Sequence, residues 1–136
     1  MNAHGFVRLT RDIDIVLALN PENAARGLNA LLAIGYNMSA PVKPEEFADA
    51  ETREDWRRSK GMIVLKLWSD EHRRTPVDIF VYEPFDFMVE TEAAEALEVC
   101  PGVKAPVVSL ATLLRMKREA GRPHDLIDIE ELQRGR

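Results

Sequence analysis

The sequence has a single cysteine, no apolar run long enough to cross a bilayer, and no block of lysine or arginine. One cysteine excludes an internal disulfide and favours the reducing environment of the cytoplasm. The lack of a long apolar run predicts a protein that does not enter membranes. With 18 basic and 23 acidic residues the formal net charge is -5. The chain therefore lacks the basic surface typical of proteins that bind DNA tightly and nonspecifically.

Two common kinds of binding motif are also missing. There is no Gly-rich phosphate-binding loop of either usual pattern. The three histidines, His4, His72 and His124, are too scattered for a zinc site. The 136 residues are 46% hydrophobic and 30% charged, which predicts one globular domain spanning residues 1–136.

Apolar periodicity and turn residues predict an α+β (α/β) fold with a small mixed, largely antiparallel sheet flanked by helices. Two strands joined by a polar turn favour an antiparallel hairpin. Asn20 and Ser109 are suited to cap the helices that follow them. We expect three strands, over 13–19, 62–68 and 77–82. We expect helices over 21–34, over 110–120 and from 123 onward, and a short exposed helix within 51–58. The segment 83–106 is expected to be mostly irregular with one short helix.

Three aspartates are the candidate metal ligands. Asp12 and Asp14 are two residues apart in a strand and therefore point to one side. Such a pair of like charges is costly unless a cation lies between them. Asp78 is a lone acid in another apolar strand, and three carboxylates from two strands suit Mg²⁺ or Mn²⁺ in phosphoryl or nucleotidyl transfer. The alternative is that Asp12 and Asp14 only end a strand, but Asp78 favours the metal site.

Lys117 falls on the apolar stripe of its predicted helix. Its stem could be buried with the ammonium in water, or the ammonium could contact a phosphate; spacing alone favours the first. Asp125 and Asp128 suit the first turns of a helix, and facing inward they could also hold Lys117 or Arg122.

Arg8 and Thr10 precede the first strand. Both could reach a bound phosphate, although Arg8 could instead pair with a surface acid.

Two segments together resemble the nucleotidyltransferase superfamily with the polymerase-beta-like fold. The first reads His-Gly-x-x-Arg-x-Thr-x-Asp-Ile-Asp-Ile over 4–15, followed by Pro-Glu-Asn at 21–23. The second reads Met-Lys-Arg-Glu-Ala-Gly-Arg-Pro-His-Asp-Leu-Ile-Asp-Ile-Glu-Glu-Leu over 116–132. They are most similar to the branch that includes minimal nucleotidyltransferases and the AbiEii-type toxins of type IV toxin–antitoxin systems.

The resemblance implies transfer of a nucleoside monophosphate from an NTP to an acceptor hydroxyl, with pyrophosphate leaving. It implies Asp12, Asp14 and Asp78 as metal ligands, with Asp78 also helping to deprotonate the acceptor. Lys117, supported by Asp125 and Asp128, would contact the nucleotide. The acceptor could be tRNA or another RNA, a protein or a small molecule, and an antitoxin or a second copy of the chain could be the partner.

One feature departs from the family. Its members carry a Gly-Ser or Gly-Gly pair upstream of the first segment, where backbone N–H groups bind the nucleotide phosphates. This sequence begins after that point, so we expect either a start further upstream or a shortened relative. Two alternatives therefore stay open: a catalytically inactive nucleotidyltransferase-like binding protein, and a small metal-dependent nuclease.

Overall fold

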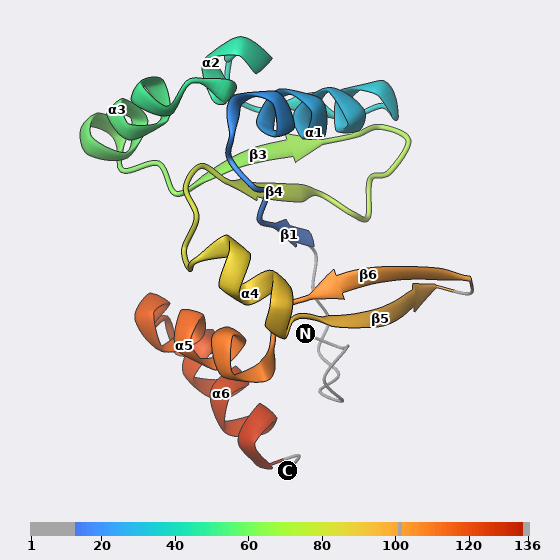
Figure 1. Cartoon of the computed structure of the whole chain (residues 1–136), viewed down its shortest axis with the longest axis vertical. Coiled ribbons are helices and arrows are strands. Elements are labelled where there is room, and N and C mark those ends of the chain that lie inside the picture. The colour runs from blue at the N-terminus through green and yellow to red at the C-terminus, as the bar shows by residue number, and fades with distance from the viewer. Residues whose placement is uncertain (1–12, 101, 135–136) are drawn as a thin grey trace. The chain divides into compact units, whose positions relative to one another are not determined.

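The computed structural model describes residues 13–100 and 102–134, which form a mixed α+β structure with six helices and a small mixed sheet (Figure 1). The chain divides into two compact units. One unit spans 10–84, and the described part of the other spans 85–134. None of the helices in the described part of the chain has the length and apolar character needed to span a membrane.

The sheet of the first unit has four strands in the order β1-β4-β3-β2. β1 runs parallel to β4, whereas β3 is antiparallel to both β4 and β2. The predicted hairpin of the second and third apolar strands is therefore confirmed. The strands are β1 (Ile13–Ile15), β2 (Asn37–Met38), β3 (Val64–Trp68) and β4 (Val77–Phe80).

The first strand is shorter than predicted. It ends at Ile15 instead of continuing to residue 19. After Ile15 the backbone forms hydrogen bonds with side chains instead of with a neighbouring strand. The Ala18 carbonyl accepts from the side-chain amide of Asn23 at 2.9 Å, and the Leu19 N–H donates to the Glu83 carboxylate at 3.0 Å. The apolar residues that follow β1 thus form the connection to the next helix.

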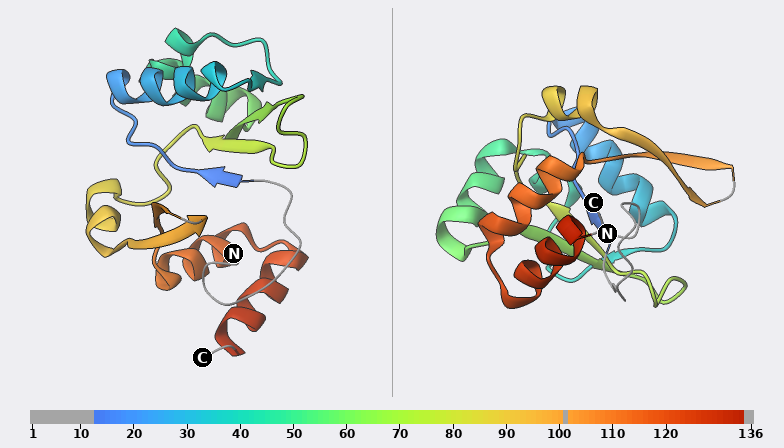
Figure 2. Two further views of the ribbon diagram at one scale, coloured as in Figure 1. Left: turned by 90° about the vertical axis from the view of Figure 1, so that its right-hand side faces the viewer. Right: turned by 90° about the horizontal axis from the view of Figure 1, so that it is seen from below.

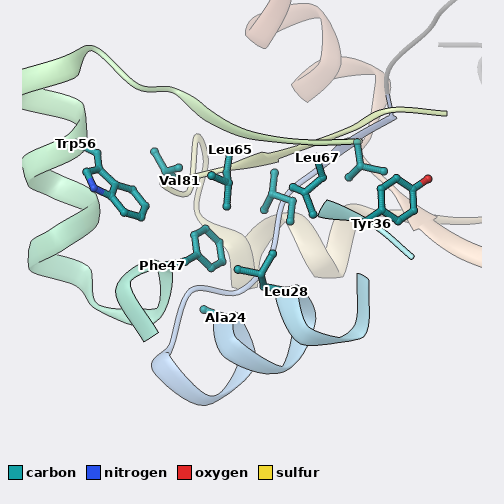
Figure 3. Packing of buried hydrophobic residues seen from close by; sticks show 10 residues of the cluster. Ala24, Leu28, Tyr36, Phe47, Trp56, Leu65, Leu67 and Val81 are labelled. Atoms are coloured by element: carbon teal, nitrogen blue, oxygen red, sulfur yellow. The ribbon is translucent and has the colours of Figure 1, made fainter. Parts of the chain in front are cut away.

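Three helices cover one face of this sheet: α1 (Pro21–Ala33), α2 (Pro44–Ala48) and α3 (Ala50–Lys60) (Figure 1). Asn20 caps α1 as predicted, because its side chain accepts from the Asn23 N–H at 3.0 Å. The predicted apolar stripe of α1 is buried at Ala24 and Leu28. Figure 3 shows Leu28 and Phe47 of these helices directed toward Leu65 and Leu67 of β3.

The prediction of a short exposed helix within 51–58 was wrong in its burial and its extent. α3 runs over eleven residues and buries Arg53 and Trp56. Asp49 begins the helix by accepting from the Thr52 N–H, and Gly61 ends it with a left-handed backbone at φ 62°. The charged run therefore contains one aromatic residue of the core, Trp56.

The second unit begins with α4 (Phe87–Ala93), continues through a two-stranded hairpin and ends with a pair of helices (Figure 2). The hairpin of β5 (Glu95–Cys100) and β6 (Val103–Val107) corrects the expectation of a mostly irregular segment over 83–106. The closing helices α5 (Leu110–Ala120) and α6 (Pro123–Arg134) confirm the prediction. Ser109 caps α5, and Gly121 ends it at φ 62°.

Candidate metal and nucleotide site

Asp14 and Asp78 lie directly opposite each other in neighbouring strands. β1 and β4 pair in parallel, and Asp14 is the register partner of Asp78. Adjacent strands are about 4.8 Å apart, and register partners present their side chains on the same face of a sheet. The structure thus brings together two of the three predicted carboxylates, although they are 64 residues apart in sequence.

The two aspartates belong to the face opposite the hydrophobic core. Their strand neighbours Ile13 and Ile15 pair with Val77 and Ile79, and both of these β4 residues belong to the core. Because side chains alternate along a strand, Asp14 and Asp78 point away from α1, α2 and α3. Val77, Ile79 and Val81 thus lie on the core face of this segment, and Asp78 lies on the other.

Lys66 extends this acidic pair into a row across three strands. It is the register partner of Asp78 in β3, and its Nζ lies 3.5 Å from Asp78 Oδ2. The lysine side chain is 63% exposed, whereas that of Asp78 is 12% exposed. The row therefore places two carboxylates and one ammonium at neighbouring positions on one face.

Sequence reasoning missed Lys66. The signal was present, because Lys66 alternates with the buried Leu65 and Leu67 within β3. Its position opposite Asp78, however, depends on the register of the hairpin, which the apolar pattern did not define.

Other predicted ligands lie outside the described residues: Arg8, Thr10 and Asp12. Within 13–100 and 102–134, no three His, Cys, Asp or Glu side chains form a group that could hold a metal ion. Asp12 is not among these residues. The proposed set of three carboxylates stays a prediction, and its described members are Asp14 and Asp78.

A second charged cluster lies between α5 and α6. Lys117 Nζ donates to Asp128 Oδ2 at 2.9 Å and approaches Asp125 Oδ1 at 3.5 Å. Arg122 adds a contact from its Nε to Asp125 Oδ2 at 2.6 Å. Asp125 lies in the first turn of α6 as expected, and both Asp125 and Asp128 are fully buried and face inward to hold Lys117.

The preferred interpretation of Lys117 was wrong. A lysine with its ammonium in water would not be 12% exposed and bonded to two buried carboxylates. Because desolvating an isolated carboxylate is costly, the ammonium is the counter-ion that makes this burial tolerable.

The positive charges of this cluster also lower the pKa of Asp125. Burial raises the pKa of its carboxyl, but the hydrogen bonds and charge of Arg122, with the charge of Lys117, outweigh burial and hold the pKa below its usual value. Asp125 is therefore ionised at neutral pH. The cluster joins two helices of one unit, and the acidic row belongs to the sheet of the other.

Comparison with known protein families and with curated proteins found no match for this chain.

Proposed function

We propose that the protein is a metal-dependent nucleotidyltransferase-like protein with the polymerase-beta-like fold, acting on an NTP in the cytoplasm. The observation that supports this proposal is the register of Asp14 with Asp78 on the sheet face opposite the core. Two carboxylates at adjacent positions repel each other unless a cation is shared between them. Their oxygen atoms are the donors that Mg²⁺ and Mn²⁺ prefer.

The residues fit a divalent cation in charge and in donor type. Asp14 and Asp78, with Asp12, would hold the ion, and a bound Mg²⁺ or Mn²⁺ would neutralise charge on the reacting phosphate. Asp78 would accept the proton of the acceptor hydroxyl. Arg8 and Thr10 would contact the phosphates from the segment before β1.

Lys117 and Asp125 are proposed to support nucleotide binding on the basis of the family resemblance. In the structure the Lys117 ammonium already has two carboxylate partners. A contact with a phosphate would have to compete with both of them. Its structural contribution to the α5–α6 pair is therefore the part that its contacts support.

A second candidate function is supported by the Lys66–Asp78 ion pair. An ammonium 3.5 Å from Asp78 supplies part of the positive charge that a metal would otherwise provide. This pair favours the alternative of a nucleotidyltransferase-like protein that binds nucleotide without transferring it. An antitoxin, tRNA or a second copy of the chain are the proposed partners in either case.

Metal binding is tested by titrating Mn²⁺ into the wild type and into the double variant Asp14→Asn with Asp78→Asn, using calorimetry. We expect the variant to stay folded and to lose Mn²⁺ binding, because the amides remove both charges. Asp70→Asn is the matched control, since Asp70 is an exposed acid of the loop between β3 and β4. Equal Mn²⁺ affinity in the wild type and the double variant would contradict the metal site.

Transfer is tested separately with labelled NTPs, Mg²⁺ and total tRNA. Incorporation of label that is lost in the double variant would support nucleotidyl transfer. Mg²⁺-dependent binding of NTP without incorporation would support the non-catalytic candidate, and shortening of the RNA would indicate a nuclease.

A further inference from the structure

The sheet face that carries Asp14 and Asp78 also exposes two larger side chains of β3. Lys66 and Trp68 are two residues apart and therefore lie on the same face. The residues that alternate with them, Leu65 and Leu67, are buried in the core on the other face. Lys66 and Trp68 are therefore the β3 side chains that this face offers to a ligand, whereas Asp78 beside Lys66 is largely buried.

We propose that Lys66 and Trp68 bind the nucleotide: the Lys66 ammonium contacts its phosphates, and the Trp68 indole stacks on its base. This inference rests on the proposed function, because it assigns the substrate of the same site. It adds two residues that the sequence motifs did not indicate.

The Lys66 ammonium is the cationic side chain of the row and lies beside the proposed metal ligands. Asp12, Asp14 and Asp78 carry three negative charges, which a divalent cation and Lys66 together would balance. A phosphate approaching Lys66 would therefore meet a positive group without a net negative charge behind it. The ammonium has three donors, and the exposed side chain of Lys66 can direct the others to a ligand while one faces Asp78.

The exposure of Trp68 supports its role as a stacking surface. Trp68 is 45% exposed, whereas the other tryptophan, Trp56, is 4% exposed within the core. Residues two apart in a strand are separated by about 6.6 Å. A phosphate at Lys66 and a base at Trp68 would therefore be spaced as the two ends of one nucleotide, with the metal-binding acids beside the phosphate end.

Tryptophan fluorescence provides a direct test in the full chain. The chain has two tryptophans, and only Trp68 is placed to contact a ligand in this way. We would titrate ATP with Mg²⁺, and inorganic triphosphate with Mg²⁺, into the wild type, Lys66→Met, Trp68→Leu and Trp68→Phe. Lys60→Met is the matched charge control, since Lys60 lies at the end of α3, a helix that covers the other face.

The two variants are expected to differ in which ligand they affect. ATP should quench the wild-type fluorescence, and Trp68→Leu should weaken ATP binding about tenfold in calorimetry without changing triphosphate binding, since stacking on an aromatic is worth about 1–3 kcal/mol per base. Trp68→Phe should recover part of the loss. Lys66→Met should weaken both ligands about fivefold, and Lys60→Met should change neither.

Several results would overturn the inference. If Trp68→Leu bound ATP with the wild-type affinity, the proposed stacking on Trp68 would be contradicted. If it lost affinity for ATP and triphosphate equally, Trp68 would have a structural role instead. A Lys66→Met variant with unchanged triphosphate affinity would remove the phosphate role. Failure of the proposed metal site is distinguishable: ATP would quench Trp68 equally with and without Mg²⁺, which would leave the nucleotide contacts of Lys66 and Trp68 supported.

Discussion

The ammonium of Lys117 lies between two buried carboxylates, Asp128 at 2.9 Å and Asp125 at 3.5 Å. Removing one partner of a buried ion pair leaves an uncompensated charge, which commonly costs about 3–5 kcal/mol. Lys117→Met keeps most of the apolar stem and removes the charge. We expect it to lower the free energy of unfolding by about 3 kcal/mol, measured by urea denaturation with circular dichroism.

Arg118→Met is the control for this prediction, because Arg118 is the next residue and its side chain is exposed. It should change the free energy of unfolding by about 0.5 kcal/mol or less. Adding Asp128→Asn to Lys117→Met should restore part of the stability, since it removes the orphaned carboxylate. Equal stability of Lys117→Met and Arg118→Met would contradict the structural role of the ion pair.

Single residues differ in how much of their role the sequence could predict. The face of Asp78 followed from strand alternation, since its neighbours Val77 and Ile79 are apolar. Asp125 and Asp128 were offered by the sequence as possible partners of Lys117, but its own helix could not decide between this pairing and an ammonium in water, because the two acids lie on the next helix. The spacing of residues within one helix or strand predicts which face of that element a residue lies on. Its contact partners depend on how the elements pack against one another.

At the scale of the helices, Glu90 of α4 binds the N-terminal end of α5. Its carboxylate accepts from the Ser109 N–H at 2.8 Å and from the Thr112 hydroxyl at 2.6 Å. Burial raises the pKa of Glu90, but the hydrogen bonds from Thr112 and Ser109 outweigh burial and hold the pKa below its usual value. The carboxylate thus joins two helices and stabilises the folded state in its ionised form.

Because the pKa of Glu90 is lower in the folded than in the unfolded protein, its carboxylate stabilises the folded state at any pH above its pKa in the unfolded chain, which is about 4.3 for Glu. This stabilisation is lost as the pH falls through the pKa of Glu90 in the folded protein. Glu90→Gln should therefore be less stable than the wild type at pH 7, by about 1–2 kcal/mol. The difference should narrow at pH 3. Urea denaturation at both pH values checks this, with Glu92→Gln as the control because Glu92 is exposed on the same helix. A difference that does not depend on pH would contradict the role of the ionised carboxylate.

The elements that the sequence predicted well are those with complete local signals. α1 has a capping Asn20 and a proline at its first position, and α5 has a capping Ser109 and a terminal Gly121. The hairpin of β5 and β6 was missed because proline within a strand argues against one, and Pro106 lies in β6. Pairing with Ala96 on the partner strand holds this segment extended despite the proline.

Across the molecule, the packed cluster of buried hydrophobic residues lies within the unit of residues 10–84, whereas α6 of the other unit buries Ile129 and Leu132. Composition and periodicity predicted the mixed α+β class, but not the division into two compact units, since that division depends on contacts between distant segments. The core also draws on α2, whose apolar contribution the sequence did not reveal. Its buried members are Ala24, Leu28, Tyr36, Phe47, Trp56, Leu65, Leu67, Val77, Ile79 and Val81.

Phe47 of α2 is fully buried in this core, so its truncation tests how much of the unit depends on a short helix that periodicity did not predict. Phe47→Ala should lower the free energy of unfolding by about 3–5 kcal/mol, the usual cost of the lost burial and the cavity left behind. Both tryptophans of the chain lie in this unit, so fluorescence during urea denaturation follows its unfolding. Ile63→Ala is the control, because Ile63 is 55% exposed and its loss should cost far less. If the two variants unfolded at the same urea concentration, Phe47 would not be part of the core on which the sheet and its acidic row depend.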